Sequence, residues 1–294
     1  MALVLLALTA VASVAQPAPV TVPMVDCDGL ACVDLTFPGE THGRFAVDTG
    51  GSNSIIDAAF AKSIHADIQP YTGRDGKVNP NFFVATISNA SFGSLALGDI
   101  KFIVADLSSI MSGQETLQLS GTIGLPVMAN RLLTVGYPAR TVTLSSPLTA
   151  PVPCPSFCGD LASITFGKAG PPILVATSGF AVNGKPVSLQ VDLMYSGSIV
   201  LFDASLEKLS FADLAHSTTA KEHFAHTDGG VDMLRAAAKS ESFGELTLAK
   251  DAPLYFPTPG VHQPDGLFDG TVGVALLKKF RVTLDFFDHK MWIS

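Results

Sequence analysis

The sequence has little charge and no excess of basic residues. Asp, Glu, Lys and Arg make up 15% of its 294 residues, and the formal net charge is −8. A nucleic-acid partner needs a basic face, so this balance argues against one. Hydrophobic residues make up 47% of the chain, which is typical of a globular protein and not of a disordered one. The length is sufficient for two domains of ordinary size.

The chain also lacks hydrophobic runs that would cross a membrane comfortably, and its most apolar stretch lies at the start. Residues 1–15 read MALVLLALTAVASVA, with no Lys or Arg ahead of the apolar run. Ser13 and Ala15 are small residues, and Gln16-Pro17 follow, as at the cleavage site of a secretory signal peptide. We therefore predict a signal peptide over 1–15 and a secreted or periplasmic protein, with an uncleaved membrane anchor as the alternative.

Cysteine is scarce, and its four residues form two close pairs, Cys27 with Cys32 and Cys154 with Cys158. Export favours disulfides. Free thiols and a metal site are the alternatives, although a zinc site would prefer tighter Cys-x2-Cys pairs and a reducing compartment. We expect two small disulfide loops that stabilise the fold modestly, because short loops remove little entropy from the unfolded chain.

Several catalytic signatures are absent as well. No serine lies in a Gly-x-Ser-x-Gly elbow, and no Gly-rich phosphate-binding loop precedes a helix. His216, His223 and His226 are near one another in sequence, but no carboxylate or Cys is spaced to complete a metal site convincingly. We interpret these histidines as surface residues of a loop and predict neither a metal nor a cofactor.

The sequence does contain an internal repeat. Residues 121–145 align without a gap with residues 270–294, and five positions are identical. Two further blocks recur in the same order, 91–97 as 242–248 and 45–56 as 189–200. The offsets of 144, 151 and 149 residues are nearly constant, which indicates a duplicated unit of about 130 residues, a normal domain size.

A proline-rich segment separates the two copies. Residues 147–155 contain four prolines, and proline fixes φ and removes a backbone donor. This segment is therefore predicted to be a linker or crossover and not a core strand. The predicted lobes are 20–146 and 156–294.

Most of each copy reads as short strands, rich in Val, Ile, Leu, Phe and Thr and broken by Gly, Asn, Asp and Pro. Asn183-Gly184 is typical of a tight hairpin turn. Short helices are predicted over 57–64 and 203–209, where an Asp precedes good helix formers. The fold class is therefore all-β with minor helix. The clearest predicted strands are 30–37, 43–48, 82–87, 94–106, 140–145, 173–182, 186–193, 246–249 and 281–286.

The strongest local motif is FAVDTGGS at 45–52. An apolar strand leads Asp48 into a turn, where Thr49 offers a hydroxyl and Gly50 permits a tight backbone. Thr122-Ile123-Gly124 and Thr271-Val272-Gly273 provide a second, repeated signature. Together these motifs resemble the aspartic proteases of the pepsin and retropepsin group, over roughly residues 27–294.

The resemblance implies a two-lobed acid-protease fold with a short helix after each catalytic loop, and it implies Asp48 and Asp192 as the catalytic pair. Two such carboxylates share one proton and activate a water, without a metal or a covalent intermediate. Each lobe supplies one aspartate, so a monomer suffices, and the partner is a peptide or protein substrate. Residues expected to support the site are Thr49, Gly50, Ser52 and Ser196.

A flap is expected to cover the site, as a β-hairpin between the catalytic loop and the glycine block. Residues 71–77 are the best candidate tip because they are polar and contain glycine, with Tyr71, Gly73 and Gly76 as the named positions. Residues 227–230 occupy the corresponding place in the second copy.

The second copy departs from the family pattern, because Leu193-Met194 follow Asp192 where the family has Thr-Gly. Leu193 has no hydroxyl to bond across the interface, as the family's threonines do. Either Ser196 or Ser198 supplies the lost hydrogen bonds and the protein is an exported endopeptidase, or the chemistry is lost and the protein only binds peptides.

Overall fold

The computed structural model is mostly β, with 50% strand and 11% helix, which confirms the all-β prediction. It describes residues 18–73, 76–107, 118–155, 157–165, 172–224, 231–259, 261 and 266–294. The predicted signal peptide lies outside these residues. Within the described ranges, no helix combines the length and the apolar character needed to traverse a membrane.

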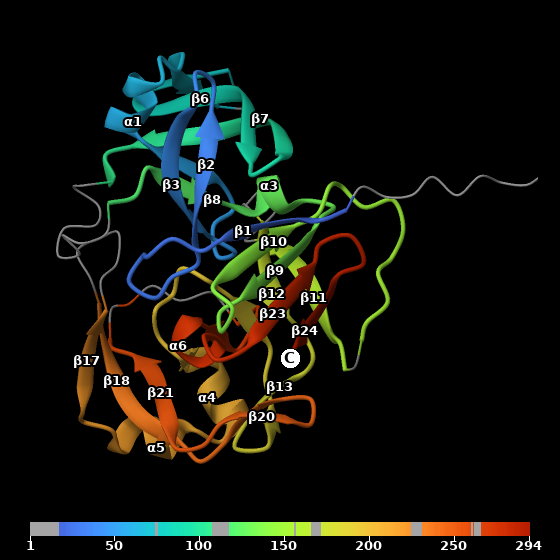
Figure 1. Cartoon of the computed structure of the whole chain (residues 1–294). Coiled ribbons are helices and arrows are strands. Elements are labelled where there is room, and N and C mark those ends of the chain that lie inside the picture. Colours follow the sequence, from blue (N-terminus) through green and yellow to red (C-terminus); the bar gives the residue numbers. More distant parts are fainter. Residues whose placement is uncertain are drawn as a thin grey trace, which may run out of the picture.

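The N-terminal half contains a closed six-stranded barrel (Figure 1). Its strands follow the order β2-β3-β8-β4-β7-β6, and the pairing of Thr36 with Ser91 closes β6 onto β2. Phe37, Phe45 and Phe102 fill its interior. The elements of this half are β1 Val20–Pro23, β2 Cys32–Phe37, β3 Thr41–Val47, β4 Ser54–Asp57, α1 Ala58–Ser63, β5 Ile68–Thr72, β6 Val78–Phe92, β7 Leu95–Ala105, β8 Gly121–Ile123, α3 Leu125–Met128, β9 Leu132–Gly136 and β10 Thr141–Leu144.

The C-terminal half repeats the central pairings of this barrel. Parallel β15 and β22 correspond to β3 and β8, and antiparallel β16 and β22 correspond to β4 and β8. The strands here are β11 Gly159–Thr165, β12 Pro172–Ala176, β13 Phe180–Val182, β14 Lys185–Pro186, β15 Leu189–Val191, β16 Ile199–Leu201, β17 Lys221–Phe224, β18 Val231–Ala238, β19 Glu241–Phe243, β20 Leu246–Ala249, β21 Ala252–Pro257, β22 Gly270–Val272, β23 Arg281–Asp285 and β24 Lys290–Ile293. The helices are α4 Asp203–Leu209, α5 Ala212–Ser217 and α6 Val274–Leu277.

A continuous run of strands, β1-β10-β9-β23-β24-β11, joins the two halves. Its centre is the antiparallel pair β9–β23, in which Thr134 lies opposite Thr283. These threonines are 149 residues apart, and their hydroxyl oxygens are 3.0 Å apart. They are also equivalent positions of the sequence repeat. A local twofold axis therefore passes between them and relates the flanking parts of the two halves.

Short-range features of the sequence correctly predicted two helix starts, a hairpin turn, the linker and both disulfides. Asp57 caps α1 by accepting hydrogen bonds from the N–H groups of Ala59 and Phe60, and α4 begins at Asp203 as expected. Asn183 and Gly184 both have positive φ and connect β13 to β14 in a two-residue hairpin. The linker 147–155 contains neither helix nor strand. Both expected disulfides are present, Cys27–Cys32 and Cys154–Cys158.

Two predicted strands are interrupted. The segment 173–182 divides into β12 and β13, because Gly179 adopts a φ of +105° and redirects the chain into a different sheet. The segment 186–193 divides at Ser188, whose N–H and hydroxyl both donate to the Asp269 carboxylate. Side-chain bonding and a positive φ broke these strands, and neither is visible in the apolar pattern of the sequence.

Candidate active site

Asp48 and Asp192 occupy corresponding positions at the ends of β3 and β15. The N–H of Asp48 donates to Ile123 O at 2.9 Å, and the N–H of Asp192 donates to Val272 O at 3.0 Å. Each aspartate is thereby hydrogen-bonded to the glycine-containing segment of its own half, 122–124 or 271–273. Both side chains remain partly accessible, so each strand delivers a carboxylate to a surface that solvent reaches.

The fold brings these two carboxyl groups to the same place. A Cβ built on Gly50 would lie only 2.5 Å from Cγ of Asp192, so the backbone of the Asp48 turn touches the carboxyl group of Asp192. A Cβ on Gly51 would overlap the Asp48 carboxylate itself. Gly50 and Gly51 are therefore required by close approach, since any side chain there would displace a carboxylate.

Backbone N–H groups hold each carboxylate in the same way. Gly50 and Gly51 donate to Asp48. In the second copy, Met194 and Tyr195 donate to Oδ1 of Asp192 at 2.8 and 3.1 Å. The backbone cradle of the Asp192 carboxylate is therefore present although Leu193-Met194, and not Thr-Gly, follow this aspartate.

The electrostatics of the pair favour a retained proton. Burial, and then the negative charge of Asp192, raise the pKa of Asp48 from its ordinary value to about 7, against the opposing effect of the Gly51 and Gly50 N–H groups. Two neighbouring carboxylates cannot both ionise cheaply in a poorly hydrated setting. The pair can therefore hold one proton at mildly acidic pH, with one carboxylate as a base and one carboxylic acid as a donor.

Thr49 connects the two halves directly beneath the pair. Its buried hydroxyl donates to Val191 O at 2.7 Å and accepts from Leu193 N at 3.1 Å. Leu193 is fully buried and has no hydroxyl to return the interaction. Gln190 adds a longer contact, from Nε2 to Gly50 O at 3.5 Å. The network across the interface is therefore one-sided and is supplied mainly by the first copy.

The serines do not take the roles expected of them. Ser52 Oγ accepts from the Asn53 amide at 3.3 Å and has no bond to Asp48 in the described chain. Ser196 is exposed, and its side chain has no hydrogen bond to any described residue. The hydroxyl of Ser198 donates to Glu241 at 3.2 Å and not to Asp192. The prediction that Ser196 or Ser198 replaces the lost hydrogen bonds is therefore wrong, because backbone amides already serve Asp192 and a buried carboxylate attracts the Ser198 hydroxyl.

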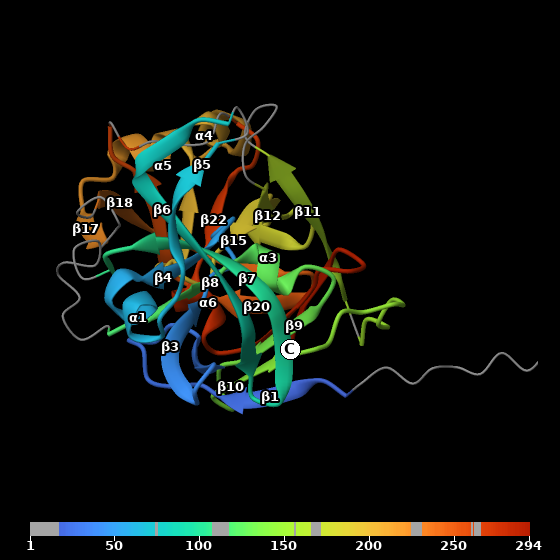
Figure 2. The same cartoon turned by 90° about the horizontal axis from the view of Figure 1, so that it is seen from above.

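The predicted flap residues lie in the hairpin formed by β5 and β6, which Figure 2 shows extending from one side of the barrel. Tyr71 is in β5. Gly73 and Gly76 are in the turn, where Gly73 N–H donates to Lys77 O and Gly76 N–H donates to Gly73 O. Residues 74 and 75, and the corresponding segment 227–230 of the second copy, lie outside the described residues.

Sequence reasoning missed three residues: Tyr137 and Tyr195, whose pKa values are raised by burial and also by the charge of nearby Asp192, and Glu241, which accepts a hydrogen bond from Ser198. The Tyr137 hydroxyl is buried without a hydrogen-bond partner among the described residues, and burial together with the charge of Asp192 raises its pKa. Tyr195 packs its ring against Phe224 at 5.6 Å between centroids. Glu241 is fully buried. The repeat alignment contained a signal for two of them, because Tyr195 aligns with Gly51 and Glu241 with Ala90.

Comparison with known proteins adds no assignment. No family model matches the chain, and no curated protein matches it. Among the described residues, no three His, Cys, Asp or Glu side chains are grouped so that they could hold a metal ion. The sequence motifs and the geometry of the aspartate pair are therefore the features of the molecule that point to a function.

Proposed function

We propose that this protein is an aspartic-type endopeptidase with a two-lobed pepsin/retropepsin-like fold, its lobes spanning 20–146 and 156–294. The observation that carries the proposal is the contact between the Asp48 turn and the Asp192 carboxyl group at Gly50. The matching backbone bonds to both aspartates, and the twofold relation between Thr134 and Thr283, support it.

Each group has a defined part in the proposed hydrolysis. The ionised carboxylate takes a proton from a water, whose oxygen forms a bond to the peptide carbonyl carbon. The protonated carboxyl group gives its proton to the carbonyl oxygen. The leaving nitrogen then receives a proton from the pair. The C–N bond breaks as one hydroxyl of the tetrahedral diol becomes the new carbonyl and returns its proton to the pair, which again holds one shared proton. Backbone N–H groups and Thr49 keep the carboxylates aligned throughout.

A peptide-binding protein without catalysis is the second candidate. Leu193 and Met194 favour it, since the two short side-chain bonds across the interface beneath the pair both come from Thr49. Loss of a few kcal/mol of preorganisation lowers a rate several-hundred-fold. The intact backbone cradle of Asp192 favours the enzyme over this alternative.

Hydrolysis of a denatured protein by the wild type and by Asp48→Asn tests the proposal. We expect cleavage by the wild type and a loss of at least about a thousandfold in the variant, because the single remaining carboxyl group cannot serve as both base and proton donor. Asp34→Asn, at an exposed position of β2, is the matched control and should cleave normally. Equal cleavage by the wild type and Asp48→Asn would exclude this pair as the catalyst, whereas peptide binding without cleavage by either would support the second candidate.

The proposal includes export as a monomer to an extracellular or periplasmic compartment. The apolar segment 1–15 and the two disulfides support it, because disulfides persist in oxidising compartments. N-terminal sequencing of the exported protein tests it, and we expect the mature chain to begin at Gln16.

A further inference from the structure

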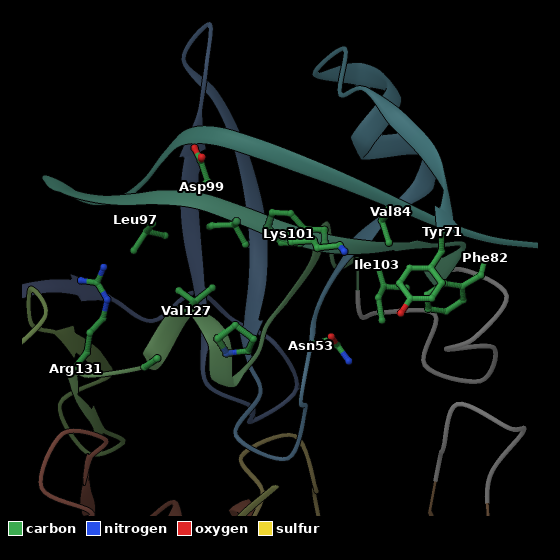
Figure 3. A pocket seen from close by; sticks show the side chains of 14 residues that line it. Asn53, Tyr71, Phe82, Val84, Leu97, Asp99, Lys101, Ile103, Val127 and Arg131 are labelled. Carbon is green, nitrogen blue, oxygen red and sulfur yellow. The ribbon is translucent and has the colours of Figure 1, made fainter. Parts of the chain in front are cut away.

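A cavity of about 640 Å³ lies between strands β6 and β7 and helix α3 (Figure 3). Asn53, five residues after Asp48, contributes to its wall. Tyr71 and Phe82, from the predicted flap hairpin, lie at one end, and Arg131 lies at the other. The cavity therefore reaches from the neighbourhood of the catalytic turn to a buried cation.

Arg131 is buried, with 7% of its surface exposed. Its Nη1 donates to the backbone carbonyl of Ser145 at 2.8 Å, and no described carboxylate lies within ion-pair distance of its guanidinium. Burial also lowers the pKa of Arg131. A buried cation without a counter-ion is unfavourable, so an anion arriving in the cavity would gain more there than at the protein surface.

The fold itself does not require a cation at this position. In the sequence repeat, Arg131 aligns with Phe280, which packs against the hydrophobic core of the second half. An apolar side chain therefore satisfies the same place in the corresponding structure. Arg131 therefore lies beside the cavity of the first half although packing alone would accept an apolar residue at this position.

The other charges of the cavity leave it with a positive balance. Lys101 lies over the Tyr71 ring, 5.5 Å from its centroid. Asp99 accepts a hydrogen bond from Ser88 at 2.6 Å. Arg131 and Lys101 thus outnumber Asp99, in a chain whose net charge is −8. The remaining wall is largely apolar, with Val84, Leu97, Ile103 and Val127 among its members.

We propose that this cavity is a substrate subsite that takes an acidic residue of the bound peptide, with its carboxylate on Arg131 and neighbouring apolar side chains against the cavity wall. The inference rests on the proposed function, since the occupant is part of the peptide that crosses Asp48 and Asp192. A fork of guanidinium N–H groups fits a carboxylate, whereas the neutral amide of Gln lacks the charge that Arg131 would compensate.

Binding to the full chain carrying Asp48→Asn tests the inference without turnover. The probes are decapeptides with Phe-Leu at the centre and one Glu scanned through the other positions, each paired with the same peptide carrying Gln. Calorimetric titration measures each Kd. We expect the Glu peptide to bind about tenfold more tightly than its Gln partner at one position, the gain of one charge-assisted hydrogen bond. Arg131→Gln should abolish this preference, and Arg281→Gln, at an exposed arginine of β23, should retain it.

The possible results distinguish failure of the proposed subsite from failure of the proposed function. Peptide binding without a Glu preference at any position overturns the subsite and leaves the proposed function standing. A preference that persists in a folded Arg131→Gln variant overturns it as well. If Arg131→Gln unfolds, two measurements still test the subsite: the comparison of Glu and Gln peptides on the chain that retains Arg131, and the same comparison on Lys101→Gln. An arginine with a purely structural role gives no preference for the Glu peptide. Failure of every peptide to bind, with no cleavage by the wild type, overturns both proposals.

Discussion

The Thr49 hydroxyl accepts a hydrogen bond from the N–H of Leu193 at 3.1 Å, so the Asp48 turn of one half is bonded to the Asp192 turn of the other. The same oxygen donates to Val191 O at 2.7 Å. Because Leu193 cannot reciprocate, both of these short bonds across the interface depend on Thr49.

Thr49→Val should destabilise the protein by about 2–4 kcal/mol, because it leaves a buried carbonyl and a buried N–H without partners. Chemical unfolding with urea at pH 5 measures the change. Thr86→Val, at an exposed position of β6, is the matched control and should stay within about 0.5 kcal/mol of the wild type. A Thr49→Val variant as stable as this control would show that the cross-interface bonds contribute little.

Gly50→Ala should greatly reduce peptide hydrolysis, because the new methyl group would press on the Asp192 carboxyl group from 2.5 Å. We expect a loss of at least about a hundredfold in kcat/KM, since small misplacements of reacting groups have effects of this size. Gly39→Ala, in the turn between β2 and β3, is the control; its Cβ would meet nothing within 4 Å, so the positive φ of Gly39 should affect stability and not kcat/KM. Normal kinetics for Gly50→Ala would contradict the close packing of the two turns.

The rate of hydrolysis should decrease as the pH rises above neutrality. The pKa of Asp48 is raised to about 7, so the shared proton is retained below that pH and lost above it. We expect kcat/KM to decline about tenfold per pH unit above neutrality. Circular dichroism at pH 8 must show that the fold persists, so that the decline reports titration. A flat profile between roughly pH 3 and 8 would count against a shared-proton pair.

The buried Glu241 should make the fold less stable as pH rises. Burial raises the pKa of Glu241 from its ordinary value of 4.5 to about 7, against the opposing effect of the Ser198 hydrogen bond. The folded protein therefore binds more protons than the unfolded chain between these values, and the free energy of unfolding falls across that window. Asp48 contributes in the same direction, so the comparison of a variant with the wild type is needed to isolate Glu241.

Glu241→Gln should equal the wild type near pH 4 and be more stable by about 1–3 kcal/mol at pH 8, because an uncharged amide avoids the cost of a buried charge. Urea unfolding across pH 4 to 8 measures the difference. Glu245→Gln, exposed on the neighbouring turn, should show no such change. A stability difference between Glu241→Gln and the wild type that does not vary with pH would mean that Glu241 does not ionise in this window.

The local chemistry of the sequence determined much of this protein. The apolar runs predicted the all-β class, Asp57 and Asp203 predicted two helix starts, and Asn183-Gly184 predicted a hairpin. The repeat predicted which segments would correspond. These features depend on residues adjacent in the chain, whose propensities and turn preferences can be read directly.

Only the tertiary structure decided how distant residues meet. It paired Thr134 with Thr283, pressed Gly50 against Asp192, directed the Ser198 hydroxyl to Glu241 and left Arg131 facing a cavity with no counter-ion among the described residues. Register between distant strands and competition among buried donors and acceptors are settled by packing across the whole molecule. The residue pattern within any one segment does not indicate these long-range contacts.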